Sequence, residues 1–351
     1  MSSSGKNRRN RRFGGAIVLG AILAAVAFQT RSLTALAAEK KKGIDVEIPY
    51  EATVLKTSLV SPLYINEASG GMVVSDGAGG VYAVTLAGKS TELVGKSKLK
   101  HPAGVAVAPA GFGTAGQVYV LSSGDDAGGP CEVDAIDKSG SVSTFAKLPD
   151  AGSGKPTQCR DLQFGAKGTQ YAGKLYAATS GNSAIYVIDA AGKAAVFGAY
   201  DKPNAWDLTT IGFATGDDSK APNMMLVGLR LKMGGASKLG RIGIVGPDGK
   251  LKDDPYLVGF IRPSGFGTSP PNWGSYGGVF FIADFGKPAS DEGGVSDGAI
   301  YRVYKDVPRP YASNLADPTS MKFIGGKMVI ADPAIKGKAG EGGIVVISSL
   351  L

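Results

Sequence analysis

Aspartates recur at the ends of short apolar segments of this chain. The sequence places them at Asp76, Asp125, Asp126, Asp284 and Asp332. Carboxylates that meet in space suit a hard cation such as Ca²⁺, which binds about six to eight oxygen ligands. An aspartate at the end of a strand also hydrogen-bonds the backbone of its own turn, which is the structural alternative for each one. The pattern therefore indicates either a cation site or a repeated turn.

Histidine and cysteine chemistry is confined to three residues. His101 is the only histidine, so any acid–base mechanism that needs one must use it. Because it precedes a proline at the start of an apolar segment, a structural role is the alternative. Cys131 and Cys159 fit an oxidising compartment, and neither belongs to a CxxC pair. With one histidine in the chain, a Cys/His zinc site is excluded.

A repeated pattern of strands must position these residues. Its clearest copy is the apolar segment Gly278–Asp284, preceded by Pro263–Gly267 and followed by Gly298–Val303. Each copy predicts a short strand, a glycine turn, a fuller strand that ends in Asp or Ser, a loop and a further strand. The second strands of successive copies begin roughly 35 to 60 residues apart, which is typical of repeat folds. Four short strands per copy favour propeller blades over a solenoid.

The repeats predict an all-β fold, a six-bladed β-propeller whose ring is closed by an N-terminal strand joining the last blade. The last copy shows three strands, and an orphan segment, residues 44–57, precedes the first copy. An unpaired edge strand invites aggregation, so we expect this segment to be the outer strand of the last blade. We predict a single propeller domain at residues 39–351. Its blades are expected at about residues 60–98, 99–150, 155–202, 204–261, 262–316 and 317–351.

Composition and charge narrow the class of partner. The chain has 53 glycines without a collagen-like period, which suits many tight turns. Its formal net charge of +8 comes mostly from residues 1–38, which hold six basic and no acidic residues. The remainder has 32 basic and 30 acidic residues, which gives no electrostatic footprint for nucleic acid. We therefore expect no nucleic-acid partner.

The N-terminal residues 1–38 predict a signal peptide. A basic region, Lys6 to Arg12, precedes an apolar run at Gly14–Phe28 and the small residues Ala35–Ala38. This is the layout of a secretory signal with its cleavage site. The apolar run has 15 residues, whereas a bilayer span needs about 20, although an uncleaved signal anchor is the alternative. We predict a periplasmic or secreted protein with no transmembrane span in the mature chain.

The repeats resemble those of six-bladed propellers of the NHL-repeat and SMP-30/gluconolactonase-like group. The segment His101–Val107 resembles the opening of an NHL repeat. Glu67, before the segment Gly70–Asp76, is similar in placement to the first-blade glutamate of the SMP-30 group. The resemblance covers residues 63–351 and concerns the fold, so it transfers no activity by itself.

The same resemblance implies a set of metal ligands. Members of the SMP-30 group hold a divalent ion with a Glu, two Asn and an Asp from the inner strands. By position, Glu67 corresponds to the Glu and Asp317 to the Asp. The two Asn have no match in this sequence, and Asp161 and either Asp207 or Ser264 occupy the nearest places. The resemblance therefore implies Glu67, Asp161, Asp207 and Asp317 as ligands of Ca²⁺ or another divalent cation.

Propellers usually place function at one end of the central channel, where loops entering the innermost strands meet loops leaving the second strands. Cys131 opens the predicted third strand of the second blade, and Cys159 lies near the first strand of the third blade. First and third strands run in the same direction, so the two cysteines should lie towards one face of neighbouring blades and form a disulfide. The residues expected to face a ligand at the functional end are Glu67, His101, Arg160, Asp161, Trp206, Asp207, Ser264, Asp284 and Asp317.

Two hypotheses of function follow from these observations. The first is an exported β-propeller that binds a small molecule or a protein partner on its central-channel face. The alternative is a divalent-metal-dependent lactonase or ester hydrolase, in which the ion polarises a carbonyl and activates water. The two differ in one geometric requirement. The hydrolase needs the four predicted metal-ligand carboxylates to converge on one point.

Overall fold

The computed structural model describes residues 43–124, 129–152, 154, 158–200, 206–215, 221–231, 239–286, 297–336 and 340–350. The chain divides into two compact units, Met1–Gly43 and Ile44–Leu351, and the second unit contains every strand described below. The predicted signal peptide, residues 1–38, lies outside the described residues. None of the helices found in the described ranges has the length and apolar character needed to cross a membrane.

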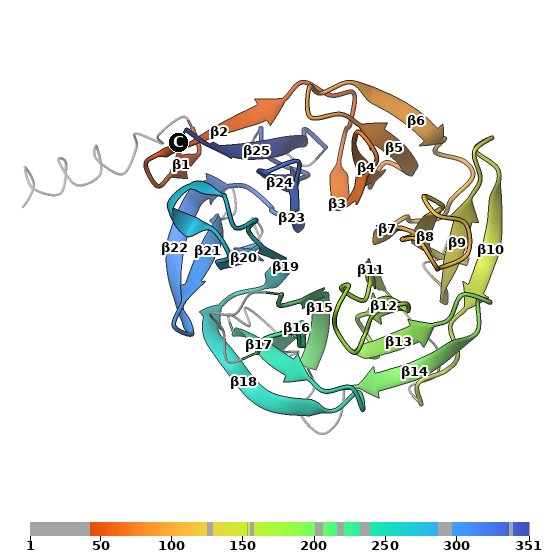
Figure 1. The fold of residues 1–351 in the computed structure, drawn as a ribbon. Coiled ribbons are helices and arrows are strands. Elements are labelled where there is room, and N and C mark those ends of the chain that lie inside the picture. The colour runs from red at the N-terminus through yellow and green to blue at the C-terminus, as the bar shows by residue number, and fades with distance from the viewer. Residues whose placement is uncertain are drawn as a thin grey trace, which may run out of the picture. The chain divides into compact units, whose positions relative to one another are not determined.

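The unit Ile44–Leu351 forms six antiparallel sheets arranged in a ring around a common axis, as predicted (Figure 1). The one helical element in the described ranges is a 3-10 turn, η1 (Gly274–Tyr276). The first three blades, from the innermost strand outwards, are β3 (Pro62–Ala68), β4 (Gly71–Asp76), β5 (Gly80–Val84) and β6 (Ser90–Val94); β7 (Val105–Val107), β8 (Val118–Ser123), β9 (Cys131–Ile136) and β10 (Val142–Lys147); and β11 (Cys159–Phe164), β12 (Leu175–Thr179), β13 (Ala184–Ile188) and β14 (Ala194–Ala199). The last three are β15 (Trp206–Phe213), β16 (Met225–Leu231), β17 (Gly240–Val245) and β18 (Leu251–Phe260); β19 (Pro263–Thr268), β20 (Phe280–Asp284), β21 (Gly298–Tyr304) and β22 (Val307–Leu315); and β23 (Ser320–Ile324), β24 (Lys327–Asp332) and β25 (Gly343–Ser349) with the closing strand.

An N-terminal strand closes the ring. Strand β2 (Tyr50–Leu55) pairs antiparallel with β25, from Tyr50 opposite Ser349 to Leu55 opposite Ile344. This confirms the prediction that an N-terminal strand closes the ring by joining the last blade. The shorter strand β1 (Asp45–Val46) instead pairs with β22 at the rim of the fifth blade. The predicted closing segment therefore joins two blades rather than one.

Tyr50 anchors the closing strand. Its hydroxyl donates a hydrogen bond to the carbonyl oxygen of Trp273 at 3.1 Å. Its ring stacks on Tyr276 with the ring centroids 5.6 Å apart. In the turn between β1 and β2, Glu47 accepts a hydrogen bond from Nε of Arg302 at 3.2 Å. The N-terminal segment is thus held by ring stacking and an ion pair as well as by the sheet.

The hydrophobic core lies between adjacent blades. Strands β12 and β20 are buried at every position because a blade packs against neighbours through both of its faces. The outer strand β6 has one buried position, Val94. One cluster joins Phe112, Tyr119 and Leu121 of the second blade to Leu162 and Tyr186 of the third. Burying a large apolar side chain contributes about 1.5–3 kcal/mol, so these clusters make the ring a firm support for its loops.

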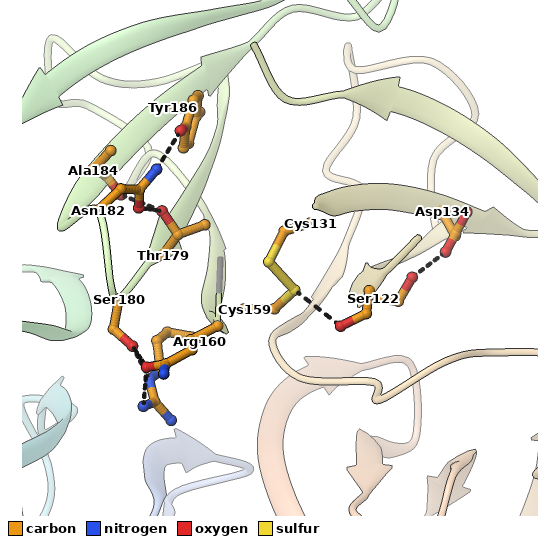
Figure 2. Close-up of a disulfide and its surroundings, with 12 residues drawn as sticks. Ser122, Cys131, Asp134, Cys159, Arg160, Thr179, Ser180, Asn182, Ala184 and Tyr186 are labelled. Carbon is orange, nitrogen blue, oxygen red and sulfur yellow. Dashed lines mark hydrogen bonds between the residues drawn. A yellow bond between two sulfur atoms is a disulfide. The ribbon is translucent and has the colours of Figure 1, made fainter. Parts of the chain in front are cut away.

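A disulfide bond joins the second and third blades. Cys131 at the start of β9 and Cys159 at the start of β11 form the predicted bond (Figure 2). The two residues are 28 positions apart in the sequence. Closing a loop of this length stabilises a fold by about 3 kcal/mol in the chain-entropy model. Since Cys159 precedes Arg160 directly, the bond also fixes the backbone that carries this predicted site residue.

Candidate functional site at the channel mouth

The innermost strands surround the axis of the ring, a region that we call the channel. They begin at one end of this axis, which we call the channel mouth. Hydrogen bonds between equivalent strand starts show this arrangement. The hydroxyl of Ser264 in the fifth blade donates to the carbonyl oxygen of Pro318 in the sixth. The hydroxyl of Thr319 donates to the carbonyl oxygen of Leu63 in the first blade at 2.6 Å, and an equivalent bond links the fourth blade to the fifth. The strand starts therefore form one ring around a shared opening.

The structure brings all but one of the predicted site residues to this end of the channel. They lie at the start of β11, β15 or β19, in the segments that lead into β7 and β23, or at the end of β20. These residues are His101, Arg160, Asp161, Trp206, Asp207, Ser264, Asp284 and Asp317.

The prediction for Glu67 is wrong. It lies near the far end of β3, opposite Met72 and beside the turn to β4, and it is exposed. Strand β3 begins at the channel mouth with Pro62, opposite Asp76. Each strand residue advances about 3.3 Å, so Glu67 lies roughly 16 Å farther along the strand than Pro62. The four carboxylates predicted as metal ligands therefore do not converge.

The carboxylate of Asp161 ties the third blade to the fourth. It is 5% exposed. One oxygen accepts a hydrogen bond from the amide of Leu162 at 2.8 Å. The other accepts from Nε2 of Gln163 at 2.8 Å, from the hydroxyl of Thr210 at 2.8 Å and from the amide of Ile211 at 3.2 Å. Because both oxygens are engaged by protein donors, this side chain has a structural role.

Asp207 is also engaged by protein donors. Its carboxylate accepts a hydrogen bond from the amide of Gly181 at 3.1 Å and forms an ion pair with Nη2 of Arg230 at 2.9 Å. No three His, Cys, Asp or Glu side chains gather as a metal site would require, within the part of the chain that the structure describes. The side chains of the channel mouth do not fit a divalent cation, since these two carboxylates are satisfied and basic groups surround them.

Asp284 belongs to a motif that occurs in three blades. Its carboxylate accepts hydrogen bonds from the amides of Ile261 at 2.8 Å and Arg262 at 2.6 Å, in the segment that leads into β19. Asp76 and Asp332 make equivalent bonds in the first and sixth blades. Burial raises the pKa of Asp284 and of Asp332, and the amide donors lower it in part. These aspartates hold loops, which is the structural alternative expected for them.

The second, third and fourth blades replace this aspartate. The equivalent residues, at the end of the second strand and opposite the start of the third, are Ser123, Thr179 and Arg230. Arg230 reverses the charge of the position. Its guanidinium pairs with Asp207 on the innermost strand, whereas the aspartates of the other blades bind backbone amides. The repeat thus changes from acidic to basic on one side of the channel mouth.

Arg160 is oriented by its neighbours beside the disulfide (Figure 2). Its Nε donates a hydrogen bond to Oγ of Ser180 at 2.9 Å, and its Nη2 donates to Oε1 of Gln158 at 3.4 Å. Ser180 in turn donates to the same oxygen of Gln158 at 2.7 Å. These bonds fix the plane of the guanidinium and leave Nη1 without a hydrogen-bond partner among the described residues.

Arg262 is the least satisfied charge at the channel mouth. This half-buried side chain makes no hydrogen bond or ion pair with any residue that the structure describes, and its guanidinium lies 4.3 Å from the ring centroid of Phe285. Burial and the positive charges of Arg160 and Arg230 lower the pKa of Arg262 to about 10. The guanidinium groups of Arg160 and Arg230 therefore lie close enough to repel that of Arg262, and the charge of Asp207 offsets part of this repulsion.

Tyr64 and Lys322 line the channel beside the arginines. Both are half-buried, on the innermost strands β3 and β23. Burial raises the pKa of Tyr64 to about 12, and Arg160 and Arg262 lower it in part. Burial lowers the pKa of Lys322, and the charge of Asp161 on the opposite side of the ring opposes this shift (Figure 1). These interactions join blades that are not neighbours, the sixth and third for Lys322 and the first, third and fifth for Tyr64, so both side chains lie towards the centre of the ring.

The remaining predicted residues have other surroundings. His101 is exposed and adopts a left-handed backbone conformation with φ 45°. The guanidinium of Arg241 covers the ring of Trp206, 3.4 Å from its centroid. Ser264 is buried and uses its hydroxyl to bond the next blade. Of these three, Trp206 and Ser264 have contacts that stabilise the fold.

Three channel residues, Tyr64, Arg262 and Lys322, were not predicted. Tyr64 and Lys322 lie within apolar strand segments, and their apolar neighbours indicate a core strand rather than a binding site. Arg262 could have been recognised from the repeat. It precedes Pro263 as Asp317 precedes Pro318, so it occupies an equivalent position with the opposite charge.

Comparisons with known proteins support the fold. No family model and no curated protein matches the sequence. A provisionally assigned oxidoreductase (glucose dehydrogenase) from Thermus thermophilus is 12% identical, with a TM-score of 0.57 over 85% of this chain and 99% of its own. The soluble aldose sugar dehydrogenase of Escherichia coli is 12% identical, with a TM-score of 0.54 over 86% and 99%. A provisionally assigned gluconolactonase is 10% identical, with a TM-score of 0.56 over 87% and 94%. These likenesses confirm the predicted resemblance to gluconolactonase-like propellers at the level of the fold alone.

Proposed function

We propose that this protein is an exported β-propeller that binds a small molecule at the channel mouth. The observation that carries the proposal is the state of Arg262. A half-buried charge without an acceptor costs free energy, and nearby guanidinium groups add to that cost. Side chains that weaken a fold in this way are typical of binding sites, where the ligand supplies the missing partner.

Export has two supports. The disulfide between Cys131 and Cys159 suits an oxidising compartment, because cytosolic thiols are kept reduced. The basic and apolar pattern of residues 1–38 is that of a secretory signal. Both features fit the periplasm as well as the cell exterior.

A small molecule suits this site better than a protein partner. Tyr64 and Lys322 point into the channel and are only half-buried, so solvent reaches polar groups that a flat protein surface would not contact. Propellers of this fold include proteins named as glucose dehydrogenase and aldose sugar dehydrogenase, so sugars and sugar acids are sensible first probes.

The alternative, a metal-dependent lactonase or ester hydrolase, lacks the arrangement that it requires. Glu67 lies at the other end of its strand. Asp161 and Asp207 give their carboxylate oxygens to protein donors. The described residues therefore favour the binding protein over the hydrolase.

A ligand screen by thermal denaturation tests the proposed function. We expect at least one compound in a panel of sugars, sugar acids, lactones and phosphorylated metabolites to raise the Tm of the purified chain. A ligand present at about 100 times its Kd stabilises a protein by about 2.7 kcal/mol. Glucose, gluconate, gluconolactone and glucose 6-phosphate form the core of the panel.

The control for this screen is a pair of matched substitutions. Lys322→Trp places a large side chain in the channel, whereas Lys147→Trp makes the same change at an exposed position of the outer strand β10. The shift in Tm should disappear in the first variant and persist in the second. A shift that survives Lys322→Trp, or a panel without any hit, would refute a ligand site at the channel mouth.

A further inference from the structure

We infer that the ligand of the channel mouth carries an oxyanion, a carboxylate or a phosphate, which Arg160, Arg230 and Arg262 bind together. This inference rests on the proposed function and specifies the chemical class of its ligand.

The available hydrogen-bond donors support an oxyanion. An arginine side chain has about five N–H donors in a fixed fork, which matches two oxygens of a carboxylate or phosphate. Arg262 uses none of its donors on the described residues. Arg160 is held through Nε and Nη2 and keeps Nη1 for a ligand. Arg230 is held by Asp207, which fixes the direction of its guanidinium. Arg160 and Arg230 are thus oriented by protein partners, whereas Arg262 contacts the ring of Phe285 and keeps its donors for a ligand.

The local charge supports the same class of ligand. Residues 39–351 are nearly neutral, with 32 basic and 30 acidic residues. At the channel mouth, the carboxylate of Asp207 pairs with Arg230 and acts on Arg262, and the carboxylate of Asp284 also acts on Arg262. Lys322 adds another positive charge within the channel and has Asp161 as its nearest recorded counter-charge. A cluster of basic side chains attracts ligands of negative charge.

The repeat also argues against a purely structural role for the arginines. In the first, fifth and sixth blades, the loop that leads into the innermost strand is held by an aspartate. The fourth blade has Arg230 at this position, and the fifth has Arg262 where the sixth has Asp317. Arg230 forms an ion pair with Asp207, and Arg262 lies over the ring of Phe285, so both side chains also contribute to the fold. Neither contact uses all the N–H donors of its guanidinium, and the remaining donors suit the binding of an anion.

Isothermal titration calorimetry of the purified full chain tests this inference. The probes are inorganic phosphate, succinate as the carboxylate, and glucose as the uncharged control. We expect phosphate or succinate to bind, and whichever binds identifies the source of the oxyanion. Arg262→Gln should weaken that binding at least 10-fold. Arg262→Lys keeps the positive charge but loses the planar guanidinium that can bind two oxygens at once. Its affinity for the anion should therefore lie between those of Arg262→Gln and the unmodified chain.

The matched control is Arg309→Gln, which removes the same charge from an exposed position of the outer strand β22. The affinity of this variant for the anion should stay within about twofold of that of the unmodified chain, because an exposed charge on an outer strand is largely screened by salt. A thermal melt of each variant verifies that it is folded.

The outcomes separate the two proposals. Loss of binding in Arg262→Gln with retention in Arg309→Gln supports the oxyanion site. Failure of both anions to bind, or equal binding by both variants, overturns it. If a neutral compound still gives a shift in Tm that Lys322→Trp abolishes, the binding function stands and only the ligand class is wrong. If no compound does so, both proposals fail.

Discussion

At the scale of single residues, the channel mouth shows a conflict between binding and stability. Arg262 is half-buried and has no acceptor among the described residues. Its pKa is lowered to about 10 in the folded protein, so folding disfavours its charged form. A group of this kind destabilises the fold at every pH below its folded pKa, and the penalty is lost as the pH rises from that value towards the ordinary pKa of arginine in the unfolded chain.

We predict that Arg262→Met raises the Tm of the ligand-free protein. Methionine keeps an apolar stem beside Phe285 and removes the repulsion from Arg160 and Arg230. Stabilising substitutions of this type contribute about 0.5–2 kcal/mol, which is roughly 1–5 °C for a domain of this size. Differential scanning fluorimetry at pH 8 and at pH 11 measures the effect. The gain should be smaller at pH 11, where Arg262 has lost most of its charge, and a lower Tm for the variant at pH 8 would contradict this account.

At the scale of strands and loops, a repeated aspartate fixes the loops of the channel mouth. Asp76, Asp284 and Asp332 each bind two amides of the segment that leads into an innermost strand. Such bonds hold loop backbone that has no sheet partner at that point. They fix the position along the channel axis of neighbouring side chains, including that of Arg262.

We predict that Asp284→Asn destabilises the protein by about 2–3 kcal/mol, since hydrogen bonds to a charged acceptor are strong and an amide nitrogen cannot accept them. Asp189→Asn is the matched control. Asp189 also accepts bonds from two amides, at 3.0 and 2.9 Å, but it lies in an exposed turn. Urea denaturation at pH 7 compares the two variants. Equal losses in both, or no loss in Asp284→Asn, would show that the motif does not hold the loop.

The sequence predicts elements of this fold better than it predicts the site. Glycine turns and buried apolar segments mark the second strands, such as Gly278–Asp284, because both faces of these strands are covered. The site depends on which end of a strand a residue occupies. Glu67 lies three residues before Gly70, the left-handed glycine of the turn between β3 and β4, and this places it at the far end of its strand. The pairing of Arg230 with Asp207 joins distant segments, and no local pattern reveals it.

At the scale of the whole propeller, the ring depends on bonds between blades. The disulfide joins the second blade to the third beside Arg160 (Figure 2). Serine, threonine and aspartate side chains link the starts of the innermost strands from the third blade round to the first. The position of each arginine at the channel mouth is therefore a property of the assembled ring.

We predict that Cys131→Ser combined with Cys159→Ser lowers the free energy of unfolding by about 3 kcal/mol, the chain-entropy value for this loop. The binding of the oxyanion should weaken as well, because the backbone next to Arg160 is less restrained. Guanidinium denaturation with and without a reducing agent measures the loss. The reducing agent should destabilise the unmodified chain and leave the double variant unchanged. A double variant as stable as the oxidised chain would contradict the prediction.

The closing strand has a consequence for the order of folding. Tyr50 lies opposite Ser349 in the completed sheet, so the two partners are about 300 residues apart in the chain. Contacts this distant make folding slow, because a long loop must close before they form. While the chain is being synthesised, β2 has no strand β25 to pair with until β25 has left the ribosome. The blades can form one by one, but the ring is completed only after β25 has been synthesised, so the ring stays open while the intervening blades are made.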